Sequence, residues 1–221
     1  MDQWHFRAVQ QNDWISLLYL LNLIALVLMQ INDRVRFRNL LRLFNHTIYF
    51  GNHALDKNLN YFSIFNGASF FIIINTLSIS LYTFLQIKGA PPFFAFEFYY
   101  VFLTLLLFLV LRFLFVHFIV QAIDRQGQLK AVFFRSFTYQ LQACIFALPP
   151  LIVFYFNPYP TALLISFFCL PLLIWCYFHL RLYIRYFVSH SNHLLYLIFY
   201  LCTIKIAPWL WFYLIIIEPR L

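Results

Sequence analysis

The chain has 221 residues, of which 64% are hydrophobic and only 10% carry a formal charge. A water-soluble domain of this size needs a more charged surface, so the composition excludes an ordinary soluble fold. The net charge of +8 is compatible with nucleic-acid binding, but in so apolar a chain a basic excess is typical of cytoplasmic loops and anionic headgroups, and we expect no nucleic-acid partner.

Several apolar runs reach the length of about 18 residues that crosses roughly 30 Å of hydrocarbon. The runs are continuously apolar rather than alternating, which disfavours a transmembrane barrel. The sequence therefore predicts an all-α, polytopic transmembrane bundle that forms a single integral membrane domain over residues 1–221. The predicted spans are six, and they cover residues 14–31, 62–87, 98–120, 137–156, 161–180 and 194–217.

The first predicted span follows a polar stretch that reads MDQWHFRAVQQNDW. This stretch is unlike the short basic region of a secretory signal peptide, and no small-x-small cleavage site follows the span. We therefore expect the first span to be retained as part of the bundle.

The loop after the first span contains a stretch, VRFRNLLRLFNHTI, with the spacing of a basic amphipathic helix. Its apolar face holds Phe37, Leu40, Leu41, Phe44 and Ile48, and its basic face holds Arg34, Arg38 and Arg42. Such a helix would lie in the headgroup plane, with its apolar side chains immersed and its arginines at anionic phosphates. Two interpretations remain open: an elbow that anchors the bundle, or a docking face for a partner or a specific lipid.

Polar side chains within the second and third predicted spans are expected to face other helices rather than lipid. In the second span they are Asn66, Asn75, Thr76, Ser78 and Ser80, and we expect them to form hydrogen bonds between helices. The third span carries Arg112 and His117 toward its inner end, where both can reach the cytoplasmic rim.

Prolines lie within the last three predicted spans, at Pro149, Pro150, Pro171 and Pro208. Each removes one intrahelical hydrogen bond and frees a carbonyl that a neighbour must satisfy. The resulting kinks are compatible with gating, although static packing kinks are the commoner explanation.

The sequence lacks the residue patterns of the common catalytic sites. No two carboxylates are placed as a general acid and base, and neither HExxH nor GxSxG occurs. His190 and His193 have a spacing that suits two metal ligands, with His179 before them, but no nearby cysteine or carboxylate completes a site. We therefore expect no enzymatic activity, no metal and no cofactor.

Lys205 lies at the centre of the last predicted span, in the stretch YLCTIKIAPW. A cation at this depth costs on the order of 2.5–3.5 kcal/mol on insertion scales, so it should face the bundle or a wet cavity. The spans supply no carboxylate at the same depth, which leaves carbonyls near the prolines, water, a neutral amine or a carboxylate of another subunit. Lys205, Arg112 and His117 are therefore the intramembrane candidates for contact with a partner or ligand.

The last predicted span, which reads LLYLIFYLCTIKIAPWLWFY, resembles the closing signature of an uncharacterised integral membrane family of Bacteroidota, a family built on a domain of unknown function. The likeness extends over nearly the whole chain from about Trp14, through RVRFRNLLRLFNHTIYF and KAVFFRSFTYQ. Tyr200, Leu201, Cys202 and Pro208 match the specific part of the signature. At Lys205 the family usually has glutamate, so a shared role as a proton-carrying carboxylate is in doubt for this chain.

The resemblance implies an inner-membrane protein of no known enzymatic activity. In that phylum, the type nine secretion and gliding machinery is the obvious assembly to consider as a partner. The resemblance supports the class of protein and its compartment, and it adds no mechanism.

The distribution of basic residues predicts the orientation in the membrane. The first, third and fifth loops carry Arg34, Arg36, Arg38, Arg42, Lys57, Arg125, Lys130, Arg135, Arg181 and Arg185, whereas the two ends and the other loops carry Arg7, Lys88 and Arg220. The positive-inside rule then places the odd loops in the cytoplasm and both termini in the periplasm.

The sequence therefore favours a non-enzymatic subunit or scaffold of the bacterial inner membrane, surrounded by membrane lipids and assembled with other membrane proteins or with itself. The supporting features are the short loops between spans and the central cation at Lys205. The alternative is a small transporter or a protein that binds a lipid or anion, which rests on the same cation and on the prolines of the last spans.

Overall fold

The computed structural model describes residues 13–41, 63–87, 98–123, 128–156, 173, 175–181 and 184. All of these residues except Asp33 and Ser63 are helical, and none of them lies in a strand. The named helices are α1 (Asp13–Asn32), α2 (Arg34–Leu41), α4 (Ile64–Ile87), α5 (Phe98–Ile123) and α6 (Gln128–Phe156). The predicted all-α class is confirmed for this part of the chain.

Three stretches of the described residues are long and apolar enough to cross a membrane, namely Trp14–Asn32, Ile64–Phe84 and Phe134–Phe156. A shorter apolar stretch, Phe98–Leu114, lies in α5. These lengths and compositions mark the chain as a membrane protein. The predicted span 194–217 lies outside the described residues, and of the span 161–180 only residues 173 and 175–180 are described, so the count of six stays a prediction.

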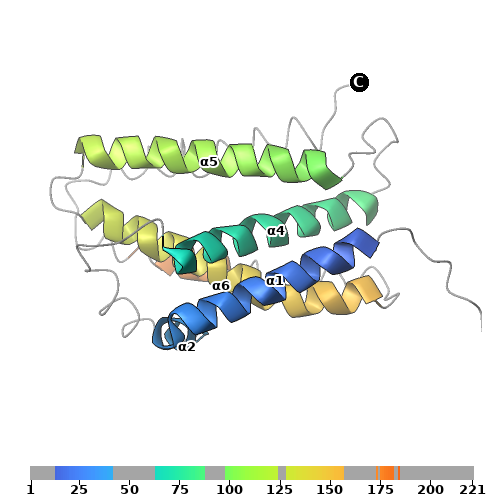
Figure 1. The fold of residues 1–221 in the computed structure, drawn as a ribbon. Helices are drawn as coiled ribbons and strands as arrows, with labels where there is room; N and C mark the ends of the chain where they lie inside the picture. Colours follow the sequence, from blue (N-terminus) through green and yellow to red (C-terminus); the bar gives the residue numbers. More distant parts are fainter. Residues whose placement is uncertain are drawn as a thin grey trace, which may run out of the picture.

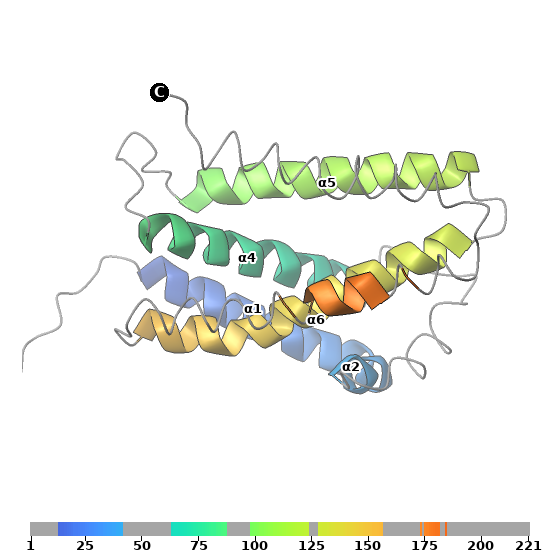
Figure 2. The same cartoon turned by 180° about the vertical axis from the view of Figure 1, so that it is seen from behind.

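Helix α4 is the central helix of the bundle and contacts α1, α5 and α6. Figure 1 shows α5 along one side of α4, with α1 and α6 on the other side. The view from behind in Figure 2 shows the same arrangement, with α6 in front of α1. Helix α4 therefore connects the other three helices, and the core includes Leu105 and Leu109 of α5 as well as residues of α1, α4 and α6.

One face of α1 packs against the bundle. Its buried residues recur every three or four positions, at Ile15, Tyr19, Asn22, Ala25 and Met29. The residues between them are mostly exposed leucine, isoleucine and valine, as expected for a face turned to lipid. The Tyr19 hydroxyl also donates a hydrogen bond of 3.2 Å to the carbonyl oxygen of Leu151, which joins α1 to α6.

Helix α6 begins earlier than the predicted fourth span and ends at the same residue, Phe156. It starts at Gln128, so Lys130 and Arg135 lie on the helix rather than in a loop. Pro149 and Pro150 lie inside α6, and the helix continues after them to Phe156. A proline removes only its own intrahelical hydrogen bond, and the packing of the surrounding residues maintains the rest of the helix.

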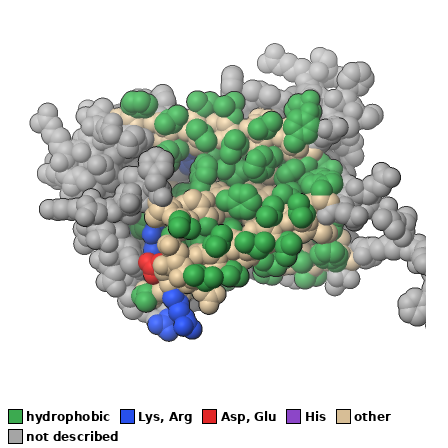
Figure 3. Space-filling model, in the orientation of Figure 1, with side chains coloured by type: hydrophobic (Ala, Val, Ile, Leu, Met, Phe, Trp, Pro, Cys, Tyr) green, Lys and Arg blue, Asp and Glu red, His purple; other side chains and the backbone are tan. Residues whose placement is uncertain are grey.

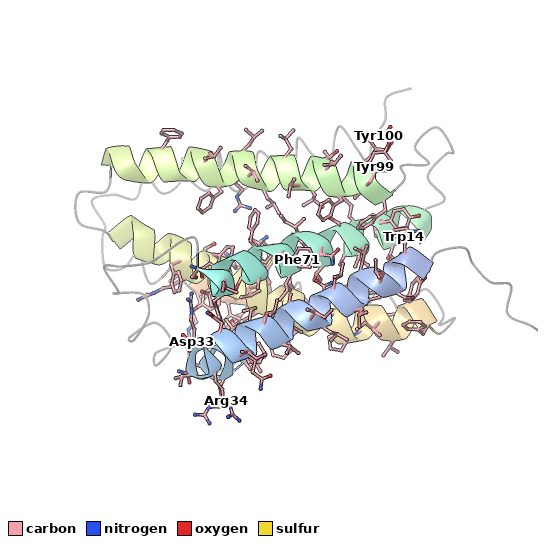
Figure 4. All side chains as sticks on the ribbon, in the orientation of Figure 1. Trp14, Asp33, Arg34, Phe71, Tyr99 and Tyr100 are labelled. Carbon is pink, nitrogen blue, oxygen red and sulfur yellow. The ribbon has the colours of Figure 1, made fainter. Side chains whose placement is uncertain are left out.

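Aromatic side chains gather at one end of the bundle, where α1 and α5 begin and α4 ends. The Trp14 ring lies 5.6 Å from the ring of Tyr82 and 4.7 Å from the ring of Phe98, measured between centroids. Tyr99 and Tyr100 lie at the same end, as Figure 4 shows. Such a cluster is typical of a membrane–water interface, where tryptophan and tyrosine are enriched.

Candidate functional site

Helix α2 lies across the end of the bundle that is opposite the aromatic cluster. Figures 1 and 2 show α2 nearly end-on beside α1, which is seen from the side, so the chain turns sharply between them. Asp33 is the residue at the turn, and its carboxylate accepts a hydrogen bond of 2.9 Å from the backbone N–H of Arg36. This is the geometry of a helix N-cap, which explains why a new helix begins at Arg34.

The guanidinium of Arg36 holds α2 against the start of α4. Its Nη2 atom donates a hydrogen bond of 3.0 Å to the side-chain oxygen of Asn66. Its Cζ atom lies 4.1 Å from the ring centroid of Phe65 and 5.6 Å from that of Phe134, on α6. A planar cation can contact aromatic faces and donate in its own plane at the same time, so a single side chain joins three helices.

Two further residues attach α2 to the bundle. Leu40 is fully buried, and Phe37 packs against the same core. The carbonyl oxygen of Leu40 is near the end of α2, where helical carbonyls lack partners, and it accepts a hydrogen bond of 2.6 Å from Nε2 of Gln142 on α6. Leu41, which the sequence placed on the same apolar face, is 41% exposed instead.

The opposite face of α2 is basic and exposed. Arg34 and Arg38 are both exposed, and Arg34 points away from the bundle in Figure 4. In Figure 3, Lys and Arg side chains gather at this end of the molecule, whereas hydrophobic side chains cover the length of the helices. Arg42 and Phe44, which belong to the same predicted faces, lie outside the described residues. The position of α2 in the headgroup plane stays a prediction.

A second group of polar residues lies deep within the bundle, on α1 and α4. Asn22, Asn75, Thr76 and Ser78 have side chains that are at most 1% exposed. Nδ2 of Asn75 donates a hydrogen bond of 3.2 Å to the carbonyl oxygen of Leu18 on α1. The other polar side-chain atoms of this group have no hydrogen-bond partner in the described part of the chain.

The polar residues of α4 therefore behave in three different ways. Asn66 and Asn75 form the expected hydrogen bonds to neighbouring helices. Ser80 instead donates to the carbonyl oxygen of Thr76 within α4, at 2.7 Å. Thr76 and Ser78 form neither kind of bond with their hydroxyl groups. The expected hydrogen bonds between helices are confirmed for Asn66 and Asn75 only. Ser80 donates within its own helix, and the hydroxyls of Thr76 and Ser78 have no partner in the described part of the chain.

A buried pair, Ser136 on α6 and His179, joins α6 to the helical stretch 175–181. His179 Nδ1 lies 3.0 Å from the carbonyl oxygen of Trp175, and since a carbonyl only accepts, Nδ1 carries the hydrogen. In a neutral imidazole, Nε2 then accepts from the Ser136 hydroxyl, 3.0 Å away. The rings of Trp175 and Tyr139 pack against the imidazole, which makes this pair a packed helix contact.

The other predicted site residues are not brought together in the described part of the structure. Arg112 is half-buried on α5, and His117 lies further along the same helix. Lys205, His190 and His193 lie outside the described residues. Within the residues that are described, no group of three or more histidine, cysteine or acidic side chains has the geometry to hold a metal ion.

Residues 15–216 of the chain match the domain of unknown function DUF4271. The chain belongs to the DUF4271 family. The match covers nearly all of the sequence, including the range of the last predicted span, and it confirms that the chain is a member of a family without an assigned function. The link of this family to Bacteroidota, and the closing signature around Cys202, stay predictions. The chain matches no curated protein and no solved structure.

Sequence reasoning missed two residues that the structure makes prominent, Arg36 and Asn22. A signal for Arg36 was present, because it lies four positions before Leu40 and therefore shares the inward face of α2. A signal for Asn22 was also present, because it is the only polar side chain in the run LLYLLNLIALVL apart from Tyr19. In a membrane helix such a residue is expected to face the protein interior.

Proposed function

We propose that this DUF4271 protein is a non-enzymatic subunit of the bacterial inner membrane that assembles with other envelope proteins, and that α2 is its docking surface. The observation that carries the proposal is the division of α2 into two faces. Arg36, Phe37 and Leu40 fix the helix to the bundle, while Arg34 and Arg38 stay exposed. A helix attached in this way presents its charges in a constant geometry, which favours recognition.

The chemistry of the exposed face indicates the kind of partner. Two arginines on one helical face attract carboxylates, and an arginine can bind a carboxylate with two parallel hydrogen bonds. We therefore propose an acidic segment of a neighbouring membrane protein as the group that binds to α2. Anionic lipid headgroups offer similar chemistry through their phosphates, and the experiment separates the two.

Purification of the tagged protein in mild detergent tests this function. We expect partner proteins to co-purify with the wild type and to be lost from the double variant Arg34→Glu and Arg38→Glu, because reversed charges repel an acidic segment. A matched control is Gln30→Ala, an exposed polar residue at the same end of the bundle, which should keep the partners.

Two results would contradict the proposal. A monodisperse monomer without any co-purifying protein would exclude an assembly subunit. Partners that stay bound to the double variant, together with weaker binding of that variant to vesicles containing anionic lipid, would make α2 a lipid anchor instead.

A second candidate function is a small transporter or a protein that binds a lipid or anion within the membrane. It is favoured by the buried polar atoms of Asn22, Asn75 and Thr76, which lie near the middle of their helices. This candidate predicts a wet cavity that Lys205 lines. Cysteine at position 205 in a cysteine-free background should then react with small water-soluble thiol reagents, and its inertness from both sides of the membrane would exclude such a cavity.

A further inference from the structure

The polar group between α1 and α4 lies at half the depth of the bundle. Asn22 is the tenth of the 20 residues of α1. Asn75 and Thr76 are the twelfth and thirteenth of the 24 residues of α4. Both helices have the length and composition to span a membrane, so these three residues are as far from water as the two helices allow.

The side chain of Asn75 reaches the backbone of α1 one turn before Asn22. Nδ2 of Asn75 donates to the carbonyl oxygen of Leu18, and in an α-helix the N–H of the residue four positions later points at that same carbonyl. For Leu18 that later residue is Asn22. The amide of Asn75 and the backbone of Asn22 therefore converge on one oxygen atom.

Four polar atoms of these three residues have no hydrogen-bond partner among the described residues. They are both side-chain atoms of Asn22, Oδ1 of Asn75 and Oγ1 of Thr76. Asn22 and Asn75 are 0% exposed, and Thr76 is 1% exposed. An unpaired polar atom in hydrocarbon is costly, so a native bundle satisfies such atoms with other groups or with ordered water.

Other hydroxyls of the bundle show that Thr76 has a local alternative that it does not use. Ser69, Ser80, Thr83, Thr104 and Thr138 each donate to the carbonyl oxygen four positions earlier, at 2.6–2.9 Å. The hydroxyl of Thr76 is turned away from that bond while it is almost fully buried. The hydroxyl therefore has no partner on its own helix, and a bound group can supply one.

The mixture of donors and acceptors defines the chemistry of the missing group. Whichever way the amide of Asn22 is turned, it presents one donor and one acceptor, and both are unpaired. Asn75 Oδ1 can only accept. A bare cation would leave the NH₂ group of Asn22 unsatisfied, and an anion would leave both amide oxygens unsatisfied. A small neutral molecule that donates and accepts satisfies all of them.

We propose that the interface between α1 and α4 holds an ordered water site, bound by Asn22, Asn75 and Thr76 at half the depth of the bundle. Buried water typically makes about three hydrogen bonds to polar groups that otherwise have no partner, which is what these side chains offer. The site does not depend on docking at α2. It extends the second candidate function, because it identifies water as a polar group that is bound inside the bundle. If the water site were absent, the predicted reactivity of a cysteine at position 205 would be unaffected.

A double-mutant cycle on thermal unfolding in detergent tests the water site. We expect Asn22→Leu to lower the midpoint temperature by about 3 °C, for the loss of its hydrogen-bonded contact with the water in a chain of this size. Asn75→Leu should lower it further, because this variant also loses the hydrogen bond to the carbonyl oxygen of Leu18. The double variant should lose clearly less than the two single losses added together, because both residues bind the same water. Ser80→Ala is the matched control, since its hydroxyl is satisfied within α4, and its effect should add to that of Asn22→Leu.

Two outcomes of this cycle would overturn the proposal. If Asn22→Leu raises the midpoint temperature, the amide is buried in a dry site and its removal relieves an unsatisfied group. If the effects of Asn22→Leu and Asn75→Leu are additive, the two side chains share no water.

A high-resolution experimental structure of the wild type decides the question independently of whether the variants fold. The proposal requires a water-sized density within about 3 Å of side-chain atoms of both Asn22 and Asn75. An empty interface, or an elongated density from a detergent or lipid molecule, would overturn the assignment to water.

Discussion

Arg36 is the residue through which α2 is held against the bundle. Its guanidinium donates to Asn66 and contacts the rings of Phe65 and Phe134. The neighbouring Arg34 and Arg38 are exposed, although the three residues have the same side chain and lie within one turn of each other. Residues two apart on a helix point in nearly opposite directions, and this alone gives the arginines different roles.

Replacing Arg36 should destabilise the protein far more than replacing Arg34. Arg36→Ala removes a charged hydrogen bond and an aromatic contact, and we expect a loss of about 2 kcal/mol of unfolding free energy. Arg36→Lys should keep only part of this stabilisation, because an ammonium group cannot lie flat on an aromatic ring. Thermal unfolding in detergent measures both, with Arg34→Ala as the control. Equal losses of unfolding free energy for Arg36→Ala and Arg34→Ala would show that the contacts of Arg36 do not stabilise the protein.

Lys205 provides a residue-scale test of the assembly. If its ammonium pairs with a carboxylate of another subunit, Lys205→Met should reduce co-purification of partners without lowering the yield of folded protein. Lys205→Arg keeps the positive charge and should retain the partners. If all partners still co-purify with the Lys205→Met variant, Lys205 is not part of the interface.

At the scale of the element, α5 shows how one helix divides between protein and lipid. Val101, Leu105 and Leu109 recur every four residues and are buried, and Leu105 and Leu109 belong to the core of the bundle. Leu103, Leu107 and Leu111 are exposed, with Leu107 at 61%. The residues of both faces are equally apolar, because lipid tails and a protein core are similar solvents for leucine. Hydropathy alone therefore could not distinguish them.

Matched substitutions on α5 should reveal this division. Leu105→Ala removes packing against α4 and should cost about 2–4 kcal/mol, as large-to-small changes in a packed core do. Leu107→Ala changes a side chain with few protein neighbours and should cost less than about 0.5 kcal/mol. Unfolding by denaturant in micelles measures the difference. Similar losses for both variants would mean that a further helix covers the outer face of α5.

At the scale of the whole molecule, the two ends of the bundle differ in chemistry. One end carries α2 with its exposed arginines, and the other carries the rings of Trp14, Tyr82 and Phe98 (Figures 3 and 4). On the face drawn in Figure 3, apolar side chains cover the helices between the two ends. The positive-inside prediction places the end with α2 on the cytoplasmic side, and this orientation stays a prediction.

Thiol labelling in cells tests that orientation. In a cysteine-free background, Arg38→Cys should react with a membrane-impermeant maleimide only after the cells are opened, because α2 is predicted to face the cytoplasm. Tyr99→Cys, at the aromatic end, should react in intact cells. Labelling of both positions from the same side would exclude a bundle that spans the membrane, and the opposite pattern would reverse the orientation.

The sequence by itself determined the class of this protein and the approximate course of α1, α4, α5 and α6. An apolar run of this length can satisfy its backbone groups in lipid only as a helix, so composition and run length suffice for that conclusion. The sequence also indicated that α2 is basic on one face. The family match from residue 15 to residue 216 agrees with a domain that extends over nearly the whole chain.

Only the tertiary structure decided which face of each helix meets its neighbours. It turned Arg36 inward and left Leu41 exposed, and it buried the unpaired amide of Asn22 at the middle of α1 while joining Asn75 to the carbonyl oxygen of Leu18. The physical reason is that helical spacing relates residues on one helix to each other, whereas contacts between helices depend on how the side chains of several helices fit together. The candidate sites of this protein lie in such contacts.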